Sequence, residues 1–207
     1  MSTETVPRWR RLEPDERREQ ILTCAIRLFG ERPYAAVSTS DVAREAGVAR
    51  GLINHYFGSK RGLYLEVVRR MVMVSDHNLP RPEGSMRQKV ESVVDWLLEA
   101  ISAHGKTWVA VIGAEGVGDD PEVERILAEA DERAAEYVVQ VVGPGDIESH
   151  GEELRALIRA FGGMVKAAGR EWITKQTLTR EQVHLVLSRQ LTHLIGDVFP
   201  QLRDDAS

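Results

Sequence analysis

A short segment that begins at Arg50 carries side chains suited to binding DNA. Arg50 and Asn54 have hydrogen-bonding groups that match base edges in the major groove, and His55 and Tyr56 follow directly. Residues 46–62 contain no Asp or Glu, whereas the wet face of an ordinary surface helix carries charges of both signs. This composition predicts a surface that approaches a polyanion.

The residues just before this segment predict a tight turn between two helices. Ser38 is suited to cap the first helix, with Asp41 three residues later. Gly47 supplies the left-handed residue that ends that helix, and Val48 fills the corner. Two helices joined in this way predict a helix-turn-helix over residues 38–57, which lays its second helix in a DNA major groove.

Apolar spacing is helical almost everywhere, and no alternating pattern typical of a strand is present. The sequence therefore predicts an all-α fold: a three-helix helix-turn-helix head and a larger helical domain, about nine helices in total. Capping boxes, Ser149 with Glu152 and Thr179 with Gln182, open the last two helices. The expected helices span about residues 14–31, 39–46, 50–57, 60–78, 86–105, 108–114, 121–143 and 179–200, and a further helix opens at Ser149 and includes residues 154–168.

Charge divides the chain in the same way. Residues 1–63 hold 11 Lys and Arg against 8 Asp and Glu, whereas the remainder holds 16 against 24. A basic head and an acidic body suit a head that meets phosphates. We expect residues 1–60 to form an arm and the DNA-binding domain, and residues 61–207 to form a ligand-binding and dimerisation domain. In the arm, Arg8, Arg10 and Arg11 either enter a minor groove, add nonspecific attraction to phosphates, or form a solvated tail.

Several motifs in combination resemble the TetR family of bacterial transcription regulators. They are Leu28-Phe29, Ala43-Arg44-Glu45-Ala46-Gly47-Val48, Arg50-Gly51, His55-Tyr56-Phe57 and Ser59-Lys60. Past residue 70 only the number and order of helices match. The resemblance implies base contacts from Arg50 and Gly51, with Asn54 and His55 on the DNA side. It also implies phosphate contacts from Ser38, Thr39, Tyr56 and Lys60.

Three positions depart from the family pattern. Leu52 stands where threonine is common, Asn54 where tyrosine is common, and Gly62 where an acid is common. The first two change the reading surface, so this chain's operator differs from those of its relatives. Leu52 either touches a thymine methyl group or packs inward, and the sequence favours neither.

One head covers only a few base pairs, so two heads on a two-fold site are expected. The resemblance implies a homodimer built by the last two helices, and an apolar stripe from Val183 to Val198 supports that assignment. Gly162-Gly163 marks either a close backbone approach, at the interface or beside a pocket, or a simple kink.

The resemblance also implies a cavity in the body for a small-molecule effector. Aromatic or soft side chains with a few polar groups suit such a cavity, although each such residue more often belongs to an ordinary core or surface. The candidates are Trp96, Trp108, Glu115, Tyr137, Met164 and Trp172, with His104 and Glu171 as further sources of polarity.

Other classes of protein fit poorly. The six histidines have no metal-ligand spacing and no phosphate-binding glycine loop is present, so we expect no enzyme activity, no metal and no cofactor. No long apolar run predicts a membrane span or signal peptide, and the single Cys24 fits the cytoplasm. The resemblance implies a repressor released by its ligand. The alternatives are an activator of the same fold and a helical adaptor that binds protein.

Overall fold

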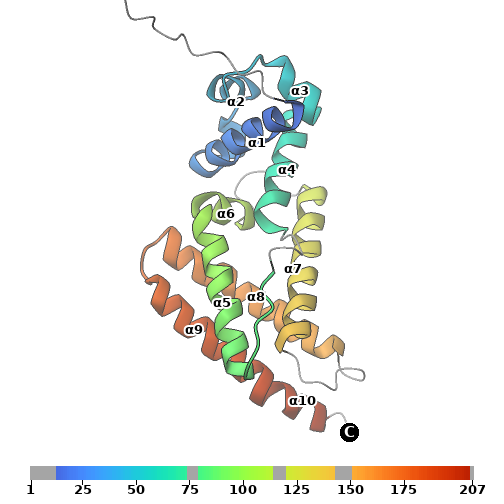
Figure 1. Cartoon of the computed structure of the whole chain (residues 1–207), viewed down its shortest axis with the longest axis vertical. Helices are drawn as coiled ribbons and strands as arrows, with labels where there is room; N and C mark the ends of the chain where they lie inside the picture. Colours follow the sequence, from blue (N-terminus) through green and yellow to red (C-terminus); the bar gives the residue numbers. More distant parts are fainter. Residues whose placement is uncertain (1–12, 74–78, 114–119, 143–150, 206–207) are drawn as a thin grey trace, which may run out of the picture.

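The computed structural model describes residues 13–73, 79–113, 120–142 and 151–205. A small head lies at one end of an elongated body (Figure 1). The all-helical prediction is confirmed, because the described residues contain no strand. The α-helices are α1 (Pro14–Glu31), α2 (Thr39–Glu45), α3 (Gly51–Phe57), α4 (Lys60–Val72), α5 (Met86–Ala103), α6 (Gly105–Ile112), α7 (Pro121–Val142), α8 (Gly151–Ile173), α9 (Arg180–His193) and α10 (Phe199–Asp205).

One hydrophobic cluster holds the head together and extends into the body. Ile21 of α1, Ile53 of α3 and Leu63 of α4 are completely buried in it. Val111 of α6 and Ile126 of α7 belong to the same cluster. The head therefore rests on the near ends of two body helices, and α4 runs from one part to the other (Figure 1).

A second cluster forms the core of the body. Its buried residues come from α5, α7, α8 and α9, together with Ile195 and Phe199 after α9, and Leu98, Leu154 and Leu187 are among the fully enclosed side chains. In this cluster α5 packs against α9, and α7 packs against α8. The apolar stripes that predicted these helices are thus directed at one another.

Helix α4 is shorter than the sequence predicted. It ends at Val72, where Met73 takes an extended backbone, and the predicted stretch from 74 to 78 lies outside the described residues. The apolar period continues past Val72 without glycine or proline, so periodicity alone gives no stop signal. The residues at this helix end, Met71, Val72 and Met73, all line a cavity in the body.

The last helical rod is longer than predicted. A π-helical turn, Leu194–Val198, follows α9 and leads directly into α10, so Pro200 lies in the first turn of a helix rather than beyond the end of one. The amide of Phe199 bonds to the carbonyl of Leu194, five residues back. Proline is tolerated in a first helical turn, where an amide donor is not required.

The helix caps agree with the sequence where they are described. Thr179 accepts a hydrogen bond from the amide of Gln182, and the amide side chain of Gln182 reaches back to Thr179. Helix α6 starts at Gly105, three residues before the predicted start at Trp108. The predicted cap at Ser149 and the arm arginines 8, 10 and 11 lie outside the described residues.

Candidate functional site

The helix-turn-helix forms through local hydrogen bonds around α2. Ser38 Oγ accepts from the Asp41 amide at 3.1 Å, and an Asp41 carboxylate oxygen accepts from the Ser38 amide at 3.0 Å. Hydrogen bonds from Ser38, with a further one from Arg44, lower the pKa of Asp41 to about 2. Gly47 has a φ of +62°, and the Val48 amide then bonds to the Ala43 carbonyl at 2.9 Å. This left-handed residue sets α3 across α2.

Helix α3 is fastened to the head by two side chains and leaves a polar face exposed. Ile53 and Phe57 are buried in the head core. Arg50, Asn54 and His55 are exposed on the opposite side. No acid lies on α3 itself, so the exposed face combines hydrogen-bonding groups with positive charge. Such a face meets the needs of base-edge and phosphate recognition.

The other predicted DNA residues differ in exposure. Gly51 and Ser38 are exposed, whereas Thr39 is half-buried. Leu52 and Tyr56 are also half-buried and pack against the head core. These contacts favour the alternative in which Leu52 packs inward. The Tyr56 ring additionally meets the His55 ring edge-on, with centroids 5.0 Å apart.

Lys60 is held over an aromatic ring at the start of α4. Its ammonium lies 4.1 Å from the centre of the Tyr34 ring, and burial lowers the pKa of Lys60. The ring's negative face attracts the ammonium, and Ser59 caps the helix by accepting a bond from the Gly62 amide at 3.0 Å. Sequence reasoning proposed Lys60 but missed Tyr34, which is 26 residues away in the chain.

The structure explains the unusual glycine in the first turn of α4. A Cβ atom at Gly62 would overlap the carbonyl oxygen of Phe57. That carbonyl belongs to the last residue of α3, so only glycine lets α3 and α4 meet this closely. The departure from the family pattern is therefore a packing requirement between the recognition helix and the helix that leads into the body.

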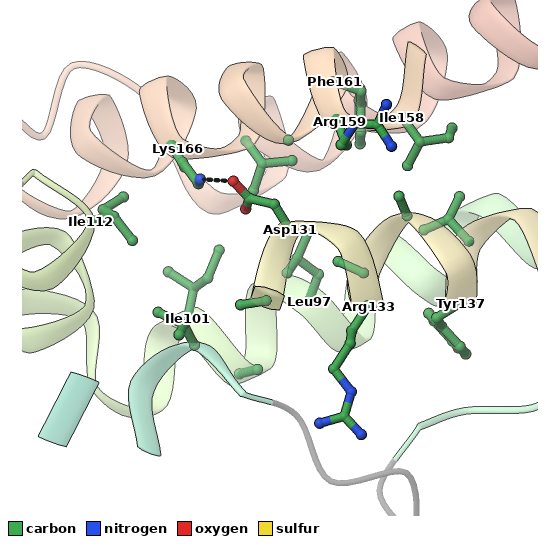
Figure 2. A pocket seen from close by; sticks show the side chains of 18 of the residues that line it. Leu97, Ile101, Ile112, Asp131, Arg133, Tyr137, Ile158, Arg159, Phe161 and Lys166 are labelled. Atoms are coloured by element: carbon green, nitrogen blue, oxygen red, sulfur yellow. Dashed lines mark hydrogen bonds and ion pairs between the residues drawn. The ribbon is translucent and has the colours of Figure 1, made fainter. Parts of the chain in front are cut away.

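A cavity of about 200 Å³ lies inside the body. Its walls come from α4, α5, α6, α7 and α8, and most of the lining side chains are apolar (Figure 2). Three of the predicted ligand residues, Trp96, Trp108 and Tyr137, line it. Burial raises the pKa of Tyr137 to about 12, and its hydroxyl donates to the Pro80 carbonyl at 2.6 Å.

The remaining predicted ligand residues are elsewhere. Met164 is exposed and Trp172 packs in the body core, and neither lines the cavity. His104 is exposed at the start of α6, and Glu171 pairs with Lys175 at 2.6 Å. Glu115 lies outside the described residues.

Four charged residues that the sequence reasoning missed do line the cavity: Asp131, Arg133, Arg159 and Lys166. Lys166 Nζ lies 2.6 Å from an Asp131 carboxylate oxygen, and this ion pair joins α8 to α7 (Figure 2). The spacing of two of them could have been noticed in the sequence. Arg159 and Lys166 are seven residues apart, which places both on the same helix face as Gly162.

The described residues contain neither a candidate metal site nor a candidate membrane-spanning helix. No group of three or more His, Cys, Asp or Glu within the described ranges is arranged to hold a metal ion. No helix in the same ranges is both long enough and apolar enough to cross a membrane.

The sequence matches one protein-family model and several known transcription regulators. Residues 21–67 match the model for bacterial regulatory proteins of the tetR family. The chain is 30% identical over 105 residues to the HTH-type transcriptional regulator BetI of Vibrio campbellii, a match that covers 47% of this chain and 53% of the relative. It thus spans about half the length of this relative. It is 29% identical over 147 residues to the transcriptional activator FasR of Mycolicibacterium smegmatis, covering 69% and 67% of the two chains.

Solved structures resemble the whole fold. A tetR-family transcriptional regulator from Streptomyces coelicolor superposes with a TM-score of 0.73 at 20% identity, over 88% of this chain and 82% of the other. The fatty acid degradation regulator FadR from Bacillus halodurans gives a TM-score of 0.65 at 18% identity, over 94% and 98%. At these identities the superpositions establish the shared fold.

Proposed function

We propose that this chain, which belongs to the TetR family of bacterial transcription regulators, represses transcription as a homodimer bound to a palindromic operator. A small molecule that binds in the body cavity relieves the repression. The family consists of regulators rather than enzymes, so the proposal includes no catalytic step. It also places the protein in the cytoplasm, where a bacterial chromosome lies.

One observation carries the DNA-binding part of the proposal. Helix α3 is anchored by Ile53 and Phe57 and presents Arg50, Asn54 and His55 to solvent without an acid among them. A protein-binding adaptor has no need of a polar, acid-free face of this kind. DNA needs it, because phosphates line both edges of the groove that the helix enters.

The dimer is supported by apolar side chains left exposed in the single chain. Large exposed hydrophobic residues among the described ones are confined to α8, α9 and α10: Met164, Leu185, Val186 and Leu202. Exposed apolar side chains that cluster on neighbouring elements favour a protein interface. A Cβ atom added at Gly163 of α8 would also meet no other atom within 4 Å, so a partner helix has room to approach there.

Relief by a ligand is supported by the position of the cavity. Met71, Val72 and Met73 at the end of α4 form part of its wall, while the start of α4 contacts the recognition helix through Gly62. A ligand that favours one placement of α4 changes the spacing of two heads in a dimer. The proposed switch is therefore a shift of α4 between two positions.

Activation is the second candidate, because FasR, a relative of this chain, is named an activator. The deciding experiment measures two quantities. Binding of the purified chain to its own upstream DNA is titrated at several salt concentrations, and expression of the adjacent gene is measured with and without the regulator. Salt-sensitive binding with increased expression after deletion supports repression. Decreased expression supports activation, and absence of salt-sensitive DNA binding contradicts both.

A further inference from the structure

The charged groups of the cavity indicate the chemistry of its ligand. The lining is apolar except for a few side chains, and the charged ones comprise three cations and one carboxylate: Arg133, Arg159, Lys166 and Asp131. The carboxylate is already bound, since Lys166 Nζ lies 2.6 Å from an Asp131 oxygen. A cationic ligand therefore finds its natural partner occupied.

The ion pair opens more easily toward an anion than toward a cation. A cationic ligand would take Asp131 from Lys166 and leave the ammonium, whose side chain is 27% exposed, without its partner. An anionic ligand would instead join Lys166, which has three N–H donors. It would release Asp131, whose side chain is 39% exposed and can turn to water.

Arg159 strengthens this asymmetry. Its guanidinium bonds to Glu132 at 2.8 Å and to Glu152 at 2.9 Å. Both acids lie outside the cavity lining, and Glu152 is 69% exposed. An arginine has five N–H donors, so it can keep these partners and also face an anion inside the cavity. Figure 2 shows Arg159 on the same helix as Lys166.

The size of the cavity limits the ligand. Drug-sized ligands occupy pockets of roughly 300–1,000 Å³, whereas this cavity is about 200 Å³. We propose that the cavity binds a small molecule with an apolar body and one anionic group, with the anion held by Lys166 on α8. This inference rests on the proposed function, because it names the class of effector for the same cavity.

Three probes with the same eight-carbon chain test the proposal: octanoate, octanol and octylammonium. Binding to the full chain is measured by calorimetry, without DNA. We expect octanoate to bind at least about tenfold more tightly than the other two, as a charge-assisted hydrogen bond implies. Tighter binding of octylammonium, equal binding of all three probes, or no octanoate binding at millimolar concentration would overturn the proposal.

Two substitutions locate the anion. Lys166→Met is expected to weaken octanoate binding about tenfold or more and to leave octanol binding unchanged. Lys175→Met is the matched control, because Lys175 follows α8, is exposed, and lies outside the cavity lining. Asp131→Asn removes the competing carboxylate and should strengthen octanoate binding, which is independent of whether Lys166→Met folds well. Unchanged octanoate affinity in both cavity variants contradicts a role for this pair.

A gel-shift titration separates this proposal from the proposed function. Octanoate that binds but does not release operator DNA leaves the ligand class standing and contradicts relief by that ligand. If the chain binds octanoate but does not bind DNA even when octanoate is absent, only the regulatory proposal is contradicted.

Discussion

Thr107 and Trp108 are consecutive residues of α6 that contact opposite parts of the molecule. The Thr107 hydroxyl donates to the Ile26 carbonyl of α1 at 2.9 Å and is buried against the head. Trp108 lines the cavity and lies against Gly169 of α8. A single short helix therefore connects the cavity wall with the first helix of the head, alongside the connection through α4.

Gly169→Ala is expected to disturb the cavity through Trp108. A Cβ atom at Gly169 would come within 2.5 Å of the Trp108 ring, so the ring must move. We predict weaker octanoate binding and a changed tryptophan fluorescence spectrum. Ala156→Ser on the same helix is the control, because Ala156 is exposed and lies outside the cavity lining. Equal behaviour of the two variants would refute the steric argument.

Arg50→Ala is expected to weaken operator binding by about 1–3 kcal/mol, because a base-contacting arginine contributes about that much. Fluorescence anisotropy with labelled upstream DNA measures the change. Arg87→Ala in α5 removes the same charge from an exposed position of the body and should leave affinity nearly unchanged. If both variants lose affinity equally, Arg50 acts through net charge and not through a base.

Lys60→Ala is expected to flatten the salt dependence of DNA binding, with the slope reduced by about one unit for a single phosphate contact. Tyr34→Leu removes the ring 4.1 Å from the ammonium and should weaken DNA binding in the same direction. Tyr34→Phe keeps the ring face and serves as the control. An unchanged slope in Lys60→Ala would exclude a phosphate contact.

Val186→Glu is expected to produce a monomer, because it places a charge among the exposed apolar side chains of α9. Sedimentation at micromolar concentration measures the oligomeric state. Glu181→Lys, at the start of the same helix, changes a charge without replacing an apolar side chain and is the control. A dimer that survives Val186→Glu, or a wild-type chain that is already monomeric, contradicts an interface on this face.

Acid is expected to weaken the junction between head and body at Asp120. Arg61 donates to both oxygens of its carboxylate, at 2.7 and 2.8 Å, and lowers its pKa from 3.8 to about 2. A lowered folded-state pKa means that the ionised carboxylate stabilises the fold above about pH 3.8 and that this contribution is lost as the pH falls toward 2. Asp120→Asn should therefore lower the melting temperature at pH 7.

The melting temperatures of the wild type and of Asp120→Asn should approach each other at low pH. The difference in melting temperature between wild type and Asp120→Asn is expected to shrink from pH 5 to pH 3. Thermal melts at matched ionic strength measure it, with Asp95→Asn in the body as a control for a more exposed carboxylate. A difference that stays constant over this range would show that the Arg61 contact does not depend on the charge of Asp120.

Features that depend only on residues close together in the chain could be predicted from the sequence. The cap at Ser38, the left-handed Gly47 and the acid-free stretch after it act within one or two helical turns, so the helix-turn-helix could be predicted from spacing. The all-helical fold followed for the same reason, because helical periodicity is a local property. Of the cavity residues that the family resemblance suggested, Trp96, Trp108 and Tyr137 line the cavity of the body, whereas Met164 and Trp172 do not.

Contacts between distant parts of the chain could not be predicted from the sequence and became visible only in the folded structure. Tyr34 beneath Lys60, Lys166 beside Asp131, and Thr107 against α1 depend on how helices pack, and local spacing does not specify the packing partner. The end of α4 at Val72 and the helical turn that contains Pro200 likewise differ from what the apolar spacing predicted. Residues of the recognition helix could therefore be named from sequence, whereas the charged pair in the cavity could not.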